Sequence, residues 1–157
     1  MHWRDFVDIE VFFKKVYTIA FRLVGEEKLA GEMATHAIER TLEMLKENEH
    51  VNSNMFKITV IEVCKIFLYE SHIFVGDDAK YYLNKFKERE IKLNQVQEAI
   101  LALGPLNRVI IIWRDMLGYK LAEIIPAVNR SEKEMHHELA NARRQLKNQL
   151  DMVGVLC

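Results

Sequence analysis

Side chains able to recognise a charged or hydrogen-bonding ligand gather near the end of the chain, between residues 131 and 138. Ser131 and Glu134 have the spacing of a capping box, in which the serine oxygen accepts the backbone N–H three residues on and the glutamate reaches back. A helix is therefore predicted to begin at Ser131, and its first turns carry carboxylate, amine and imidazole groups. The side chains predicted to be exposed there are Glu132, Lys133, Glu134, His136, His137 and Glu138.

Two amphipathic helices separated by a tight turn would position these side chains. The first helix is short, and Asn129 and Arg130 follow it as the turn. The second helix has apolar residues at spacings of four and three, which form a stripe that packs back onto the first. This pattern predicts a helix-turn-helix, in which the start of the second helix meets base edges and phosphates. The apolar residues are Leu121, Ile124, Ile125 and Val128 in the first helix, and Met135, Leu139, Ala142, Leu146 and Leu150 in the second.

The charges on this second helix are unusual for a DNA-binding helix. Its start is mostly acidic or neutral, and a glutamate repels a phosphate, although it can accept a hydrogen bond from cytosine. Three cations at positions 143, 144 and 147 either pair with the DNA backbone or balance the carboxyl end of the helix dipole. His136 and His137 are adjacent and lack the i, i+4 spacing of a metal-binding pair, so they are either exposed polar residues or contacts to a phosphate or base. The candidate DNA-binding residues are Ser131, Lys133, His136, His137, Asn141, Arg143, Arg144 and Lys147.

The composition is that of a globular protein without a strongly basic surface. Half of the 157 residues are apolar, enough for one or two small cores, and no apolar run has membrane-spanning length. The formal net charge is −1: residues 1–92 carry 14 Lys and Arg against 16 Asp and Glu, and residues 93–157 carry 8 against 7. Neither part has the excess of cations expected of a protein that neutralises many phosphates alone. If the chain binds DNA, another component is expected to supply much of the electrostatic attraction.

The amino-terminal residues and the cysteines indicate the compartment. The first ten residues, MHWRDFVDIE, have no apolar core with a small-residue cleavage site, so a cytoplasmic location is expected. Cys64 lies in an apolar segment and is expected to be buried, and it forms with Cys157 neither a disulfide framework nor a metal cluster. Glu26 and Glu27 are neighbouring carboxylates at a helix start, where they complement the helix dipole without an accompanying base or nucleophile. We therefore expect no enzymatic activity, no cofactor and no metal.

The order of the predicted elements gives an all-α fold, because glycine and proline are scarce and strand-like alternation is absent. Helices are predicted over residues 8–24, 27–47 and about 55–68, the last with N-caps offered by residues 52–54 and apolar almost all round. Further helices are predicted over 96–103 and 106–117, before the helix pair. A charged stretch over 76–92 is interpreted as a linker. The prediction is two small helical domains, residues 1–75 and 93–157, with the helix-turn-helix in the second.

The order and spacing of these elements resemble the extracytoplasmic-function sigma factors, which direct bacterial RNA polymerase to promoters. In the second domain the resemblance is gapless and includes a Leu-Pro pair, a helix-ending glycine, a Glu-Ile pair and the capping serine. The agreeing positions are Leu103, Pro105, Gly118, Glu123, Ile124, Ser131, Leu139, Ala142, Arg143 and Leu146 in the second domain, and Tyr17, Ala20, Arg22, Leu23, Val24, Gly25, Ala30, Glu32 and Met33 in the first.

This resemblance implies a transcription initiation protein with no catalytic chemistry of its own. In the family the second helix docks on core RNA polymerase, the third opens and reads the upstream promoter element near the start site, and the helix-turn-helix reads the more distant element. The resemblance implies core RNA polymerase and promoter DNA as partners. The residues placed by it at the polymerase contact are Glu32, Thr35, His36, Glu39 and Arg40. His36 and Arg40 are also explained as an i, i+4 pair on a solvated helix face.

The chain departs from the family at the positions that contact DNA. Polar family positions of the third helix fall on Val60, Ile61 and Lys65, and basic positions of the last helix fall on acidic or neutral residues. Pro126 lies inside the first helix of the pair, where a proline bends or shortens a helix. A second interpretation is therefore a sigma-like regulator that binds an anti-sigma factor or the polymerase without reading promoters. A third, a dimeric helix-turn-helix regulator, leaves the first domain unexplained.

Overall fold

The protein is represented by a computed structural model that describes residues 9–47, 54–70 and 95–152, and these residues form helices and the turns between them. The predicted all-α class is confirmed, with no strand in the described ranges. The predicted linker over 76–92 and Cys157 lie outside them. The elements are α1 (Ile9–Val24), α2 (Glu27–Glu47), α3 (Met55–Lys65), the π-helical η3 (Ile66–Glu70), α5 (Gln95–Leu101), α6 (Pro105–Ile110), the π-helical η4 (Ile111–Met116), the 3₁₀-helical η5 (Leu121–Ile124), α7 (Ile125–Val128) and α8 (Glu132–Met152).

The link between α1 and α2 is set by two consecutive residues. Gly25 has a φ of +68°, a left-handed conformation that favours glycine, and its N–H donates to the Phe21 carbonyl at 2.7 Å. Glu26 then caps α2, because its buried carboxylate accepts the N–H groups of Lys28 at 3.0 Å and Leu29 at 2.6 Å. Glu26 therefore has the helix-start role predicted for it, and α2 packs along α1.

The third helix packs against both α1 and α2 and continues into η3. Its buried side chains include Val60, Val63 and Cys64, as expected from its apolar sequence. Burial raises the pKa of the Cys64 thiol to about 12, so this cysteine is a core residue. Asn54 is the N-cap residue of α3, within the predicted range, but its side chain makes no capping hydrogen bond.

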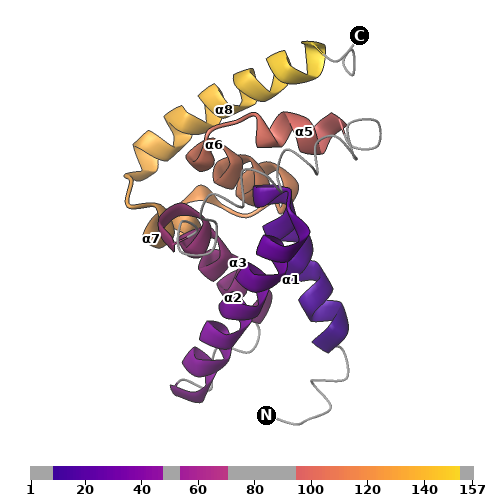
Figure 1. The fold of residues 1–157 in the computed structure, drawn as a ribbon. Coiled ribbons are helices and arrows are strands. Elements are labelled where there is room, and N and C mark those ends of the chain that lie inside the picture. The colour runs from indigo at the N-terminus through magenta and orange to yellow at the C-terminus, as the bar shows by residue number, and fades with distance from the viewer. Residues whose placement is uncertain (1–8, 48–53, 71–94, 153–157) are drawn as a thin grey trace.

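The described chain has an amino-terminal part, from α1 to η3, and a carboxyl-terminal part, from α5 to α8. In the carboxyl-terminal part, α6 and η4 form one helical run that ends at Gly118, whose φ is +75°. The buried Trp113 indole N–H then donates to the Lys120 carbonyl at 2.8 Å and holds the turn that follows. Pro126 stands at the start of α7, after the short 3₁₀ segment η5, so the predicted shortening at this proline is confirmed. Figure 1 shows α8 lying across α5 and α6 at one end of the molecule, with α1, α2 and α3 at the other end.

The two parts of the chain meet at the carboxyl end of α1, where the last turn of a helix leaves carbonyl groups without partners. Gln97 of α5 is 2% exposed, and its amide nitrogen donates to the Phe21 carbonyl at 3.1 Å and to the Arg22 carbonyl at 3.0 Å. Arg108 of α6 donates to the Leu23 carbonyl at 3.0 Å. Side chains of the carboxyl-terminal part therefore complete the end of the first helix.

Arg108 also binds its own part of the chain. Its guanidinium donates to the Leu103 carbonyl and the Leu101 carbonyl, each at 2.8 Å, and lies 5.7 Å from the Phe67 ring centroid. Burial lowers the pKa of Arg108 from its ordinary value. One side chain thus joins the end of α1, the end of α5 and η3.

A second contact between the two parts lies at Lys57 of α3. Its ammonium group forms an ion pair with Glu123 of η5 and lies 4.9 Å from the centroid of the Tyr119 ring. The Lys57 hydrogen bond lowers the pKa of the Glu123 carboxyl. The buried apolar residues of both parts form one continuous cluster, from Val16 in α1 to Ala142 in α8. Among the described helices, none has the length and apolar character needed to cross a membrane.

Replacement of Arg108 by alanine is expected to lower the free energy of unfolding by about 2–4 kcal/mol, because three carbonyl acceptors lose their partner at a partly buried site. Arg114→Ala is a matched control, since Arg114 is an exposed arginine of η4 and is expected to change stability by less than about 0.5 kcal/mol. Urea denaturation followed by circular dichroism measures both values. Equal effects of the two substitutions would contradict a joining role for Arg108.

Candidate nucleic-acid interface

The start of α8 has the local geometry predicted from the sequence. Asn129 adopts a left-handed conformation with a φ of 52°, and Val128 is the last residue of α7 before it. The Ser131 hydroxyl accepts the Glu134 N–H at 3.1 Å, which is the serine half of the predicted capping box. The turn therefore redirects the chain so that α8 begins at the surface.

One face of α8 is fixed by burial of its apolar stripe. Met135 and Ala142 are fully buried and Leu139 is 6% exposed, while Leu146 is partly buried against the same core. These residues pack α8 against α5, α6, η4 and η5. Because the stripe determines which side of the helix is inside, it also determines which residues face solvent.

The outermost face of α8 carries cationic and neutral side chains. Lys133, His137, Ala140 and Arg144 follow one another at spacings of four, three and four, so they lie on one side of the helix, roughly opposite Met135. All four are exposed, and we call them the outer stripe. The exposed Lys147 borders the outer stripe one turn beyond Arg144. The predicted DNA-binding residues Lys133, His137, Arg144 and Lys147 are thus brought together.

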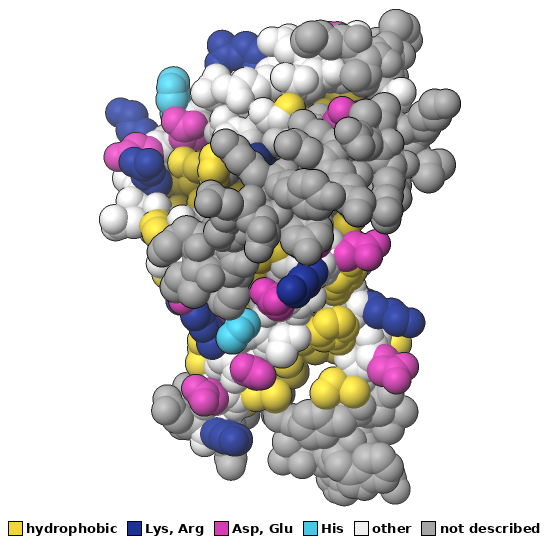
Figure 2. Space-filling model, in the orientation of Figure 1, with side chains coloured by type: hydrophobic (Ala, Val, Ile, Leu, Met, Phe, Trp, Pro, Cys, Tyr) yellow, Lys and Arg dark blue, Asp and Glu magenta, His cyan; other side chains and the backbone are white. Residues whose placement is uncertain are grey.

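Three of the four acidic residues of α8 lie on the flanks of the outer stripe, and the fourth, the exposed Asp151, continues the stripe one turn beyond Lys147. Glu134 and Glu138 are one turn apart on one flank, and Glu132 is on the other. Glu134 and Glu138 line an open hollow together with Arg130, Lys133 and His137. Figure 2 shows cationic, acidic and histidine side chains interspersed on the visible surface near the α7 end of α8. The hollow is lined by both hydrogen-bond donors and acceptors, and its charged side chains include both basic and acidic residues.

Two side chains on the flank nearer η4, His136 and Arg143, have acidic partners. His136 Nε2 lies 3.7 Å from the Glu132 carboxylate, and both side chains are exposed. Arg143 forms a bidentate pair with Asp115 of η4, with Nη2 to Oδ1 at 2.6 Å and Nε to Oδ2 at 2.9 Å. The Asp115 hydrogen bond raises the pKa of Arg143. The predicted contacts His136 and Arg143 are therefore placed apart from the outer stripe.

Within the described residues, no acidic group lies within ion-pair distance of Lys133, Arg144 or Lys147. Arg144 donates instead to the Asn141 amide oxygen at 3.3 Å, a neutral partner on the same helix. Cations that are not paired with a carboxylate remain able to attract a phosphate. The outer stripe and Lys147 therefore present three cations without an acidic partner at the surface of α8.

The residues predicted to contact polymerase lie along α2 with different exposures. Thr35, His36 and Glu39 are exposed, and Glu32 is partly buried. The Thr35 hydroxyl donates to the Gly31 carbonyl at 2.9 Å. Thr35, His36 and Glu39 therefore form an accessible polar surface on α2.

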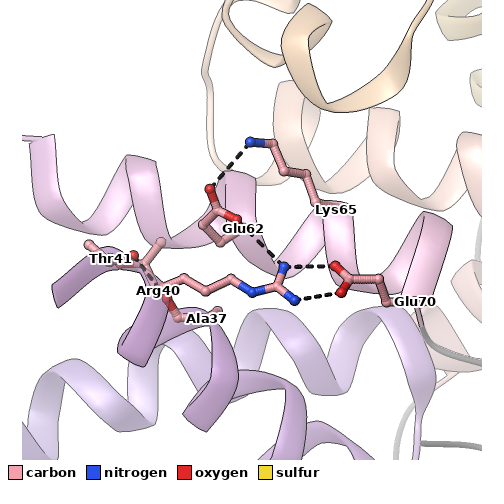
Figure 3. Close-up of polar contacts among 7 residues, drawn as sticks. Ala37, Arg40, Thr41, Glu62, Lys65 and Glu70 are labelled. Atoms are coloured by element: carbon pink, nitrogen blue, oxygen red, sulfur yellow. Dashed lines mark hydrogen bonds and ion pairs between the residues drawn. The ribbon is translucent and has the colours of Figure 1, made fainter. Parts of the chain in front are cut away.

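Arg40, the fifth predicted polymerase contact, belongs to a partly exposed ion-pair network between helices (Figure 3). Its guanidinium binds both carboxylate oxygens of Glu70 in η3, at 2.7 and 2.5 Å, and lies 3.8 Å from the Glu62 carboxylate in α3. Lys65 also binds Glu62, at 3.3 Å. Hydrogen bonding to Glu70 raises the pKa of Arg40. Arg40 thus joins α2 to α3 and η3.

The third helix presents little polar surface at the positions where the resemblance implies DNA contacts. Val60 is fully buried, and Ile61 is partly buried against the core. Lys65 is partly exposed but paired with Glu62. In this arrangement the Val60 side chain cannot reach a nucleic-acid strand.

Sequence reasoning missed Asp115, Glu70 and Arg130. Asp115 and Arg143 are 28 residues apart, and Arg40 and Glu70 are 30 apart, so no local spacing signals either pair. Arg130 is predicted to form the turn, but it also lines the hollow.

In comparisons with protein-family models, curated proteins and solved structures, the chain matches none of them. The function is therefore inferred from the geometry of α8 and α2.

Arg40→Ala is expected to lower the free energy of unfolding by about 1–3 kcal/mol, because it leaves the 5%-exposed Glu62 carboxylate with Lys65 alone. Glu39→Ala is the matched control: the adjacent side chain is exposed and its loss is expected to cost less than about 0.5 kcal/mol. Chemical denaturation measures the difference. A value for Arg40→Ala as small as that of the control would mean that the network contributes nothing to stability.

Proposed function

We propose that this chain is a sigma-type transcription initiation protein that binds core RNA polymerase through α2 and contacts promoter DNA through α8. The observation that carries the proposal is the outer stripe, where Lys133, His137 and Arg144 share the solvent face of a helix whose opposite face is buried. A helix that follows a tight turn and exposes its first turns has the form of a DNA-reading helix.

The charge of the chain supports a division of labour between this protein and the polymerase. The outer stripe with Lys147 offers three permanent cations, which is few for a protein that binds DNA by itself. A polymerase that already holds the DNA would supply most of the phosphate contacts. The role of α8 would then be to orient the complex and to distinguish sequences through the donors and acceptors around the hollow.

The accessible surface of α2 supports a protein contact distinct from the DNA contact. Thr35, His36 and Glu39 lie on α2, in the part of the molecule opposite α8 (Figure 1). Arg40 supports this surface indirectly, because its ion pairs hold α2 against α3 and η3. The proposed polymerase contact consists of exposed groups on a helix fixed by its neighbours.

A second candidate is a sigma-like regulator that binds an anti-sigma factor or the polymerase without selecting promoters. It is favoured by the burial of Val60 and by the carboxylates of Glu134 and Glu138 beside the outer stripe. Both features weaken DNA contacts while leaving the helical scaffold and the α2 surface in place.

One experiment separates the two candidates. The purified protein is incubated with core polymerase and a random pool of duplex DNA at low salt, and the DNA retained with the complex is sequenced. Enriched sequences together with run-off transcripts from them support the first candidate. Co-purification with polymerase without any enriched sequence supports the second, and no association with polymerase contradicts both.

Arg144→Gln is expected to weaken binding to duplex DNA and to reduce the slope of log affinity against log salt by about 0.9, the effect of one lost phosphate contact. Lys15→Gln removes the same charge from an exposed position on α1 and is expected to leave the slope unchanged. Fluorescence anisotropy between about 50 and 200 mM salt measures both. Equal slopes for the two variants would show that Arg144 does not contact the backbone.

A further inference from the structure

Asp115 occupies an unusual place beside the proposed DNA-contacting helix. It is the acidic residue of η4, and η4 packs directly against α8. Its carboxylate holds the Nε and Nη2 edge of Arg143 with hydrogen bonds of 2.9 and 2.6 Å. The side chains are 33% and 52% exposed, so the pair lies at the surface where a nucleic acid could approach it.

The pair changes what Arg143 can contribute to a nucleic-acid contact. An arginine paired with a carboxylate adds no net charge, so it attracts few phosphates and releases few counterions. Asp115 has a short side chain on a packed helix, and its carboxylate therefore stays near any phosphate that approaches Arg143.

Two effects of Asp115 oppose each other. A fixed guanidinium loses less side-chain entropy on binding, which favours affinity. The carboxylate also occupies one bidentate edge of the guanidinium and repels a phosphate. The slope of log affinity against log salt depends on the number of phosphates that cations neutralise. The neutralisation of Arg143 by Asp115 is therefore expected to dominate the response to salt.

We propose that Asp115 is a negative determinant of nucleic-acid binding, which neutralises Arg143 and confines phosphate contacts on α8 to the outer stripe and Lys147. This inference rests on the proposed contact between α8 and DNA. It assigns to Asp115 a role in setting the orientation of the helix on the backbone, because a phosphate bound at Arg143 would rotate α8 toward η4. Asp115 is thus a positioning residue and does not itself bind the nucleic acid.

The test uses the full chain and a labelled mixed-sequence duplex of about 20 bp, with affinity measured by anisotropy between about 50 and 200 mM salt. Asp115→Asn is expected to steepen the salt slope by about 0.9, so its affinity relative to the wild type increases about 3.5-fold between the high and the low salt concentration. In an Arg143→Gln background, Asp115→Asn is expected to produce no such gain. Thermal denaturation shows whether each variant is folded.

Glu43→Gln is the matched control, since it makes the same change in net charge at an exposed position on α2, and α2 and α8 lie at opposite ends of the molecule (Figure 1). A gain for Asp115→Asn that is absent from Glu43→Gln and is lost with Arg143→Gln supports the proposal. An unchanged or weaker affinity of Asp115→Asn overturns it, as does an equal gain for Glu43→Gln or a gain that persists with Arg143→Gln. If neither the wild type nor Asp115→Asn binds the duplex, either alone or together with core polymerase, the proposed DNA contact and this inference are both overturned; binding by the wild type without the expected gain overturns only the inference.

Discussion

The carboxyl end of α1 constrains the arrangement of all the described helices, because its last carbonyl groups are bound by side chains from a distant part of the chain. Gln97 and Arg108 supply the donors, and Gly25 redirects the backbone at the same point. A Cβ at Gly25 would lie 2.5 Å from the Leu101 side chain, so the glycine also permits the close approach of α5. Helix capping, normally a local matter, here fixes the packing of α1 against α5 and α6.

This junction explains how two surfaces with different chemistry are held on one body. The continuous core joins α2, through α1, to the helices on which α8 rests. The Lys57 and Glu123 ion pair adds a second point of attachment, which is partly exposed and worth little by itself. The exposed face of α2 and the outer stripe of α8 are therefore presented in a defined relative orientation, which the proposed simultaneous contacts with polymerase and DNA require.

The sequence predicts features that depend on neighbouring residues. The bounds of α2 and the buried stripe of α8 follow from helical periodicity, and the turn at Asn129 and the Ser131 cap follow from local residue preferences. The contacts of Gln97, Arg108 and Arg40 could not be predicted, because each joins residues distant in sequence and a charged or amide side chain gives no signal of its partner. Periodicity likewise predicts continuous helices at η3 and η4 but does not distinguish π-helical from α-helical hydrogen bonding.

The difference between local features and long-range contacts also decides what can be inferred about the proposed DNA contact. From the sequence, the start of α8 is a mixture of acids, bases and histidines without order. Once the buried stripe fixes the rotation of the helix, the acids of its first two turns fall on the flanks, and Lys133, His137 and Arg144 fall on the outer face. The ion pair with Asp115 then removes Arg143 from that set, although the sequence places it among the cations of a basic cluster. The number of cations on a helix is thus a poor guide to its affinity for phosphate. The affinity depends on the cations that remain unpaired on the exposed face. Burial determines which residues are on that face, and long-range ion pairs determine which of them remain unpaired.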